Sequence, residues 1–542
     1  MTTMRTRRRV SLSAPPAKLE TPKEVRKLRS WSYYIIFAIV ILPLQLFIMS
    51  SFLYTAQRLY HLYNNSVPYC RYLFMDIYAP LEQVIFYVYL TILNKRIQPI
   101  SLPPPHFTPS FAKQLFIRIL GDFRAVNTRR VTEWSEDTSQ GAYAAPALRR
   151  EDRRSSWDVD MLESQIPALE YNDAKARDFR EKVSTWFGHA EWHDLCHDDM
   201  LTWLSWSLLG LPLSEANLPF LESCVHLVEK RTGSCLPMKR PEGAQPPTII
   251  RLTIDPVRTR ARPILLYIII HIADMLTKFF LIWRYDCKIW IIEGENPQSG
   301  PLEYIVRIPD KKSEDKVKPV TLMHGLGFGL PHYGQIFKFL ANKFPNRPIV
   351  MPLNRATSMM IFTRRYLLPV TRQEASQGLA EVLDRLNASD TDIVSHSFGT
   401  IAHTHILKDA PHLVNKSVFL DPVTFCLWEG DLCYRFLYKV PKTGIELLMN
   451  YFIATETGLA NTLQRSFSWS CNLLWPQEMK IESTKVFIGS EDFIYDSKRV
   501  HEYLLRHGLR DGVALHYMDG FNHGECLITR NGVIDTVCEF LE

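Results

Sequence analysis

The sequence predicts an α/β protein, in which a mainly parallel β-sheet with helices on both faces carries a helical cap. A helical region and an N-terminal transmembrane helix precede this domain. Two observations lead to this prediction. From residue 286 onward, short apolar strands alternate with helical stretches, which is typical of a parallel sheet covered by helices. Near the N-terminus, residues 30–57 contain no charged residue, and about 20 apolar residues suffice to span a bilayer as a helix.

The first segment, residues 1–30, carries nine basic residues and two acidic ones, whereas the whole chain has a net charge of +6. The rest of the chain is therefore close to neutral, so we expect no nucleic-acid partner. Residues 31–56 are the predicted transmembrane helix, with Trp31 and Tyr54 as interfacial aromatic residues. A buried core helix is the alternative interpretation. The positive-inside rule places the basic tail in the cytosol.

Residues 57–125 contain a second apolar segment and a proline-rich linker. Asp76, Pro80 and Glu82 interrupt the apolar segment, so a second membrane helix, an interfacial helix and a core helix all remain open. One membrane span would place the rest of the chain on the lumenal side, whereas two would return it to the cytosol. Residues 126–160 are polar and lack hydrophobic periodicity, which predicts a disordered linker.

Residues 161–285 form the predicted helical region. His189, His193 and His197 are spaced four residues apart, so on a helix they would share one face. A metal site there is conceivable, but a polar face beside core tryptophans is favoured, and no metal site is predicted. The ten cysteines show no CxxC or paired spacing. Near the end of the region, residues 263–283 are strongly apolar but include Asp274 and Lys278, which favours a helix lying on a membrane or on the next domain over a third span.

Residues 286–542 contain the predicted sheet and its chemistry. Strands are expected at 288–293, 302–308, 319–323, 349–351, around Ile393 and Val394, and at 417–420, 485–488 and 513–517. The fifth strand runs into Ser395-His396-Ser397-Phe398-Gly399, which has the form of a nucleophile elbow, a sharp strand-to-helix turn that exposes one serine hydroxyl. Ser397 is therefore the candidate nucleophile. Gly399 supplies the small residue the turn needs, and Ser395 stands where glycine is usual.

A serine hydroxyl becomes a useful nucleophile only when a base takes its proton. His523 lies in the loop after the last predicted strand and is the favoured base, while His516, inside that strand, is its competitor. Asp492 follows the preceding strand and would orient His523 and stabilise the imidazolium. Asp421, after the strand before that, is the alternative acid.

Developing negative charge requires two backbone donors in an oxyanion hole. We expect the N–H of Phe398, just after the nucleophile, and that of Leu326, in the turn His324-Gly325-Leu326-Gly327-Phe328-Gly329. Glycine allows the backbone to approach a substrate closely. The turn is not a dinucleotide fingerprint, because GxGxxG would require glycine at position 330, which is leucine. We therefore expect no cofactor.

Taken together, these motifs resemble those of the α/β-hydrolase superfamily over about half of the chain, and more narrowly those of membrane-anchored, largely uncharacterised α/β-hydrolases of fungi and other microbial eukaryotes. The motifs that carry the resemblance are the glycine turn, the elbow, Leu420-Asp421-Pro422-Val423, Gly489-Ser490-Glu491-Asp492 and Phe521-Asn522-His523-Gly524.

The resemblance implies a membrane-bound serine hydrolase that cleaves an ester or related acyl bond through an acyl-enzyme. It also implies that residues 425–476 are a cap over the site. This segment is rich in aromatic residues, so either the substrate is a hydrophobic acyl compound or lipid, or the cap packs its own core. An acyltransferase using the same triad and an inactive membrane scaffold are the alternatives.

Overall fold

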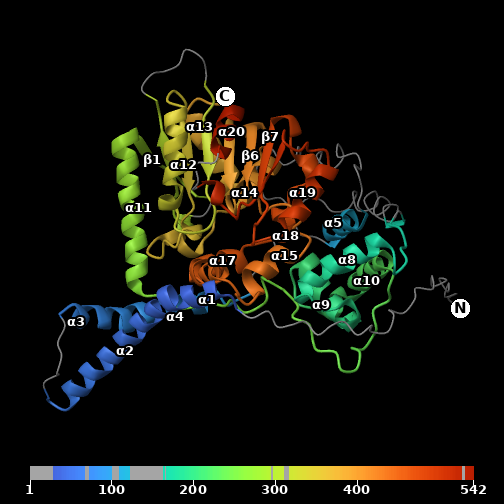
Figure 1. Cartoon of the computed structure of the whole chain (residues 1–542), viewed down its shortest axis with the longest axis horizontal. Coiled ribbons are helices and arrows are strands. Elements are labelled where there is room, and N and C mark those ends of the chain that lie inside the picture. The colour runs from blue at the N-terminus through green and yellow to red at the C-terminus, as the bar shows by residue number, and fades with distance from the viewer. Residues whose placement is uncertain are drawn as a thin grey trace. The chain divides into compact units, whose positions relative to one another are not determined.

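The computed structural model describes residues 29–66, 73–100, 109–121, 163–164, 166–294, 297–309, 317–527 and 532–542. The predicted disordered linker at 126–160 and nearly all of the basic tail lie outside these ranges. The chain forms two compact units (Figure 1). We call the described parts of Ile100–Asp255 together with Trp428–Tyr434 the helical unit, and the described parts of Lys27–Pro99, Pro256–Leu427 and Arg435–Glu542 the sheet unit.

The helical unit is built around tryptophan. Its helices are α5 (Pro109–Gly121), α8 (Ala174–Ser184), α9 (His197–Leu209) and α10 (Leu218–Thr232). Trp186 is buried against Trp203 and Trp206, with ring centroids 6.3 and 5.4 Å away. The indole N–H of Trp186 donates to the carbonyl of Trp428 at 2.8 Å. The short segment 428–434 therefore belongs to this core although it comes from a distant part of the sequence.

The predicted helix face bearing three histidines does not exist. Gly188 has a φ of 67° and ends the preceding helical turn, as glycine commonly does. His189 then lies in a loop, His193 in the 3-10 turn Trp192–Asp194, and His197 at the first position of α9. The regular spacing in the sequence therefore does not place the three imidazoles on one helix.

The sheet unit contains an eight-stranded sheet in the order β1-β2-β4-β3-β5-β6-β7-β8. The pairs β1–β2 and β2–β4 are antiparallel and all the others are parallel, so the predicted mainly parallel sheet is confirmed. The strands are β1 (Cys287–Ile292), β2 (Leu302–Arg307), β3 (Val320–Met323), β4 (Ile349–Leu353), β5 (Thr391–His396), β6 (Val414–Leu420), β7 (Thr484–Gly489) and β8 (Leu515–Met518).

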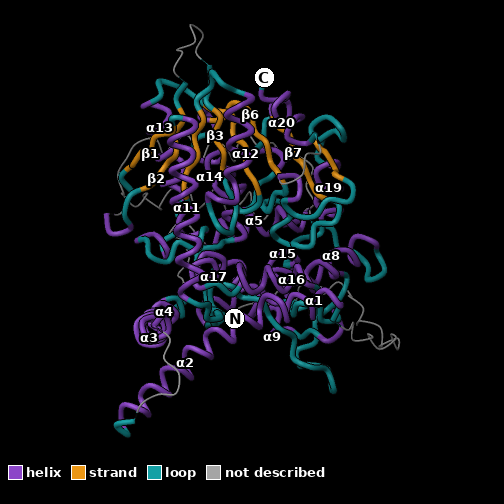
Figure 2. The backbone as a smooth tube through the Cα atoms, turned by 60° about the vertical axis from the view of Figure 1, so that its left-hand side comes forward, coloured by secondary structure: helices purple, strands orange, loops and turns teal. Residues whose placement is uncertain are grey.

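Helices cover both faces of this sheet (Figure 2). Its parallel strands are therefore buried on both sides. On one face α12 (Leu330–Lys343) and α20 (Val533–Leu541) pack on residues such as Leu322 and Val418. On the other face α13 (Arg372–Arg385) and α14 (Gly399–Asp409) pack on residues such as Ile393. α19 (Ser497–Arg506) packs beside β7 and β8.

A helical segment lies between β6 and β7. It contains α15 (Asp431–Cys433), η10 (Tyr434–Tyr438), α16 (Gly444–Met449), η11 (Asn450–Ala454), α17 (Thr457–Arg465) and α18 (Trp469–Asn472). The predicted helical character of 425–476 is therefore present. Its cap role stays a prediction.

The N-terminal part of the sheet unit is a helical hairpin. α1 (Trp31–Ile36), η1 (Phe37–Ile41) and α2 (Leu42–Tyr63) form its first arm, and α3 (Leu73–Pro80), η2 (Leu81–Phe86) and α4 (Tyr87–Arg96) form the second. Asp76 does not interrupt the second arm, because it accepts a hydrogen bond from Tyr54 at 2.7 Å and pairs with Arg58. Glu82 likewise accepts from Tyr78 and from the backbone of Ile264.

By length and composition, two helices among the described residues could cross a membrane: the 33-residue helix Trp31–Tyr63 and α11 (Ile264–Tyr285). One face of α11 packs on α12 and β1. On α11, Asp274 forms ion pairs with Arg355 at 3.1 Å and with Lys278 of the same helix at 3.0 Å. The opposite face exposes apolar side chains, including Phe279 and Trp283.

Candidate active site

The elbow is a strained turn between β5 and α14. Ser397 has a φ of 52°, a region that few residues other than glycine adopt and that often marks a functional site. The backbone N–H of Ser397 donates to the carbonyl of Leu420 at 3.0 Å, which anchors the turn to β6. At Gly399 a Cβ atom would lie 2.4 Å from the carbonyl oxygen of Met323. Glycine is therefore required there, because helix and strand touch.

Ser395 fills the position where an elbow usually has glycine. Its hydroxyl donates to the carbonyl of Val418 at 3.1 Å and accepts from Nδ1 of His403 at 2.8 Å. Nε2 of His403 in turn lies 3.1 Å from the hydroxyl of Ser417. Burial lowers the pKa of His403 to about 3. The neutral imidazole of His403, on α14, thus connects Ser395 of β5 with Ser417 of β6. These hydrogen bonds satisfy the buried Ser395 hydroxyl, which explains how serine is accommodated in this tightly packed position.

Three predicted site residues lie in one hydrogen-bonded row. The Ser397 hydroxyl donates to Nε2 of His523 at 2.7 Å, and Nδ1–H of His523 donates to Asp492 at 2.6 Å. His523 lies in the loop after β8 and Asp492 in the loop after β7, so the parallel strands bring both to the edge where β5 ends. The Asp492 side chain is fully buried, and its other oxygen accepts from the N–H of Ile494 at 2.8 Å.

The imidazole of His523 is biased toward its charged form. Burial alone lowers its pKa, but the charge and hydrogen bond of Asp492, together with the charge of Asp421, outweigh burial, and the pKa is raised above 6.5. A base with this environment can accept the serine proton and hold it as a stabilised imidazolium.

The alternative acid and base occupy other roles. Asp421 is fully buried and accepts from the N–H of Gly489 at 2.8 Å and of Gly524 at 2.7 Å, so it fastens the end of β7 and the loop that carries His523. His516 stacks on Phe487 and interacts with the carbonyl of Val513 at 3.2 Å. The structure therefore pairs His523 with Asp492 and not with Asp421.

The glycine turn after β3 lies against the elbow. A Cβ atom on Gly325 would stand 2.9 Å from that of Ser397, so the two backbones are in close contact. Within the described part of the chain, the N–H groups of Leu326 and Phe398 donate no hydrogen bond. Both predicted oxyanion donors therefore remain available to a ligand at the elbow.

Two further residues position this turn. The N–H of Gly325 donates to the hydroxyl of Tyr333 at 2.8 Å, and that hydroxyl donates to Nδ1 of His396 at 2.6 Å. Burial, followed by the neighbouring His523 and His332, lowers the pKa of His396 far below 6.5. Sequence reasoning missed both residues. His396 could have been noticed inside the elbow motif, but Tyr333 carries no signal of its own.

The strand order and the elbow at the end of β5 match the α/β-hydrolase fold. No protein-family model and no curated protein matches the sequence. Solved structures to which the chain is similar include esterases, a lipase and a phospholipase, all at low sequence identity and with low TM-scores. One is naproxen esterase from Bacillus subtilis, with 14% identity over 51% of this chain and 98% of that one and a TM-score of 0.35.

Two other similar structures are a carboxyl esterase and a phospholipase. Carboxyl esterase 2 from the mycorrhizal fungus Tuber melanosporum shows 15% identity over 47% of this chain and 86% of that one, with a TM-score of 0.34. A bacterial membrane phospholipase A shows 11% identity over 51% and 94%, with a TM-score of 0.35.

Proposed function

We propose that the chain is a membrane-anchored serine hydrolase that cleaves an ester or related acyl bond of a hydrophobic or lipid substrate. The observation that carries this proposal is the hydrogen-bonded row Ser397–His523–Asp492, with two unused backbone N–H groups beside the serine. Such a row is the requirement for activating a serine hydroxyl.

In the proposed reaction, Ser397 Oγ attacks the acyl carbon while Nε2 of His523 takes its proton. Asp492 holds the imidazole in the required tautomer and stabilises its charge. The N–H groups of Leu326 and Phe398 bind the oxyanion of the tetrahedral intermediate. The intermediate collapses to an acyl-enzyme as His523 returns the proton to the leaving group, and a water molecule activated by the same histidine then releases the acid.

Apolar side chains around the turn support a hydrophobic substrate. Leu326 and Phe328 pack in one cluster with Phe436, Met449 and Phe452 from the segment after β6. The rings of Phe328 and Phe452 lie 6.1 Å apart. A substrate that reaches the oxyanion turn from this side would meet hydrocarbon, which favours acyl chains over polar groups.

The helix Trp31–Tyr63 supports the membrane anchor. Only 11% of its most apolar window is buried in the protein, and its exposed residues include Ile39, Met49 and Phe52. Such a surface is costly in water and favourable in lipid. We expect the full-length protein to resist extraction from membranes by alkaline carbonate. Recovery in the carbonate supernatant would contradict the anchor and leave the hydrolase proposal standing.

Covalent labelling tests the hydrolase proposal. A fluorophosphonate probe should label the wild-type protein, and Ser397→Ala should abolish labelling. Ser395→Ala is a matched control from the same elbow, since its hydroxyl is buried and bonded to His403, and it should keep labelling. Probe incorporation that persists in Ser397→Ala, mapped by peptide mass spectrometry, would exclude Ser397 as the nucleophile.

A further inference from the structure

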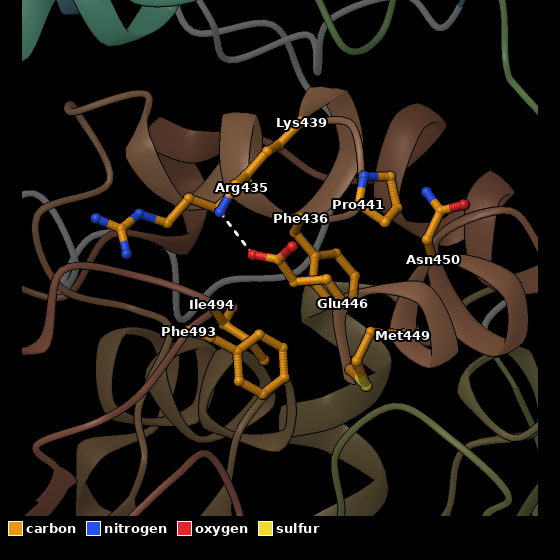
Figure 3. Close-up of a pocket in the computed structure, with 9 residues that line it drawn as sticks. All are labelled: Arg435, Phe436, Lys439, Pro441, Glu446, Met449, Asn450, Phe493 and Ile494. Atoms are coloured by element: carbon orange, nitrogen blue, oxygen red, sulfur yellow. Dashed lines mark hydrogen bonds and ion pairs between the residues drawn. The ribbon is translucent and has the colours of Figure 1, made fainter. Parts of the chain in front are cut away.

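A small pocket lies between the segment after β6 and the loop after β7 (Figure 3). The ion pair Lys439–Glu446, at 2.6 Å, borders it, and Phe493 and Ile494 belong to its lining. Its cavity volume is about 20 Å³, which is room for about one water molecule. The pocket is therefore too small to hold a ligand, in contrast to the broad apolar surface that α11 presents.

The exposed face of α11 carries a stripe of apolar side chains. Its members recur at helical spacing: Ile269, Ile272, Met275, Leu276, Phe279 and Trp283, all exposed. We call these six residues the apolar stripe. Between Ile264 and Trp283 only Asp274 and Lys278 are charged, and both lie on the opposite face. A contiguous apolar surface of this kind marks a site of interaction with a protein or a membrane.

The opposite face of α11 is fixed to the sheet unit along its length. α11 packs on α12 and β1, and Thr277 lies so close to α12 that a Cβ atom on Gly334 would stand 3.3 Å from it. The buried ion pair between Asp274 and Arg355 adds a second attachment. A helix held in this way cannot cross a bilayer without drawing sheet edges and loops into hydrocarbon, where their backbone groups would lack partners.

The N-terminal end of α11 is joined to the helical hairpin. The backbone N–H of Ile264 donates to the carboxylate of Glu82 at 2.8 Å, and the ring of Tyr267 lies 5.6 Å from that of Phe86. Figure 1 shows α11 along the side of the sheet unit from which the hairpin projects. The apolar stripe therefore begins where the proposed membrane anchor leaves the sheet unit.

The far end of α11 has the composition of a bilayer surface contact. Trp283 is 73% exposed, and tryptophan is enriched at the membrane–water interface. The charged residues that follow it, Arg284, Asp286 and Lys288, are exposed as well. Apolar residues on one face with charged residues at the end are typical of a helix that lies in the interface and does not span it.

The edge strand β1 widens the apolar surface. Ile289 is exposed and pairs with Ile305 of β2, which lies in the core beneath α12. Because directly paired residues point to the same face of a sheet, Ile289 faces the side that α11 covers. Ile291, two residues on, is exposed on the same face.

We propose that α11 lies along the surface of the bilayer that holds the hairpin, with its apolar stripe in hydrocarbon and its opposite face on the sheet. This inference rests on the membrane anchor of the proposed function and adds a second membrane contact, on the sheet unit itself. Lipid is the occupant that fits, because the stripe continues from the anchor and offers few polar groups. A protein partner would instead form several hydrogen bonds across its interface.

Three cysteine substitutions at residues of similar exposure test the proposal. They are Phe279→Cys in the apolar stripe, Phe52→Cys on the anchor helix, and Val513→Cys before β8, at the opposite edge of the sheet from β1. The native side chains are 67%, 61% and 62% exposed. The full-length protein is reconstituted in phosphatidylcholine vesicles, and alkylation by a charged maleimide is followed at each site by peptide mass spectrometry.

Hydrocarbon should protect two of the three cysteines. It excludes the charged reagent, and each unit by which it raises a thiol's pKa lowers the reactive thiolate fraction about tenfold. Phe279→Cys and Phe52→Cys should therefore react about tenfold or more slowly than Val513→Cys. Thermal unfolding checks that each variant is folded, and Trp283→Cys replaces Phe279→Cys if that variant does not fold.

The outcomes separate this proposal from the others. If Phe279→Cys reacts within about twofold of Val513→Cys while Phe52→Cys is protected, the second contact is overturned and the anchor stands. If Phe52→Cys also reacts freely, both membrane contacts are contradicted, and fluorophosphonate labelling still tests the hydrolase separately. If a second copy covers α11 instead, oxidation of Phe279→Cys with copper phenanthroline should give a covalent dimer, which would overturn lipid as the occupant.

Discussion

The variant Tyr333→Phe removes one hydroxyl group and tests whether the hydrogen bonds of that hydroxyl hold the glycine turn in place. The Tyr333 hydroxyl is the acceptor for Gly325 N–H at 2.8 Å and the donor to His396 Nδ1 at 2.6 Å. Phenylalanine keeps the ring and its packing but leaves both partners without the hydroxyl. The turn that carries Leu326 would then lose its attachment to the elbow.

The expected magnitude follows from the burial of all three groups. Leaving a buried donor or acceptor unsatisfied costs roughly 1–3 kcal/mol, so two such losses lower the free energy of unfolding by about 2–6 kcal/mol. For a unit of this size that corresponds to a decrease in Tm of roughly 3–8 °C. Loss of one oxyanion donor costs about 10²–10³ in kcat. A loosened donor should cost less, about 10–100-fold, with KM nearly unchanged.

Thermal unfolding and ester hydrolysis kinetics of the full-length protein measure the two effects. Tyr495→Phe is the matched control. The Tyr495 ring lies 6.4 Å from that of His523, and its buried hydroxyl makes no hydrogen bond to the described residues. The control should leave Tm within about 2 °C of the wild type, because no bonded partner is lost. Tyr333→Phe with wild-type Tm and kcat would refute the positioning role.

Three further predictions concern charged groups. Asp492→Asn should slow fluorophosphonate labelling by about 10³-fold or more, whereas Asp421→Asn should mainly lower the free energy of unfolding, by about 2 kcal/mol; labelling rates in the reverse order would contradict the assignment of the acid. Because only neutral His523 accepts a proton and its pKa is raised, kcat/KM should increase with pH around a midpoint above 6.5. Asp492→Asn removes that influence while burial remains, so the midpoint of any residual activity should move down; an unchanged midpoint would exclude His523 as the titrating base. Asp274→Asn weakens a buried pair with Arg355 and should cost about 3 kcal/mol in chemical denaturation; a cost below about 1 kcal/mol would contradict the pairing.

Local sequence patterns predicted the sheet well, because a buried strand is a run of apolar residues that can be recognised in the sequence itself. β7 matches its predicted bounds within one residue at each end, and the elbow strand extends two residues beyond the predicted Ile393 and Val394 on either side. β6 begins at Val414, three residues earlier than predicted, because the polar Asn415 and Lys416 interrupt the apolar run and lie at an irregularity in the pairing with β5. β8 begins at Leu515, two residues late, because Val513 and Ala514 belong to the turn before it.

Tertiary geometry was harder to predict. Asp421 and Asp492 both follow a strand, so the sequence leaves the acid open, and only the fold shows which carboxylate reaches His523. Tyr333 lies in a helix that reads as ordinary core, and its contact with His396 depends on how α12 crosses the end of β5. The spacing of the histidines from 189 to 197 suggested one helix face, but Gly188 ends the helical turn before the first of them.

The low basicity of the buried histidines has a consequence for kinetic measurements. Burial lowers the pKa of His324 and His403 to about 4 and about 3, and it also lowers those of His332 and His396. Between pH 8 and pH 5, His324 and His403 therefore stay neutral, whereas His523, whose pKa is raised, gains a proton. The acidic limb of the rate profile should follow a one-proton curve with a limiting slope of one, and its inflection gives the apparent pKa of the hydrogen-bonded His523–Asp492 pair.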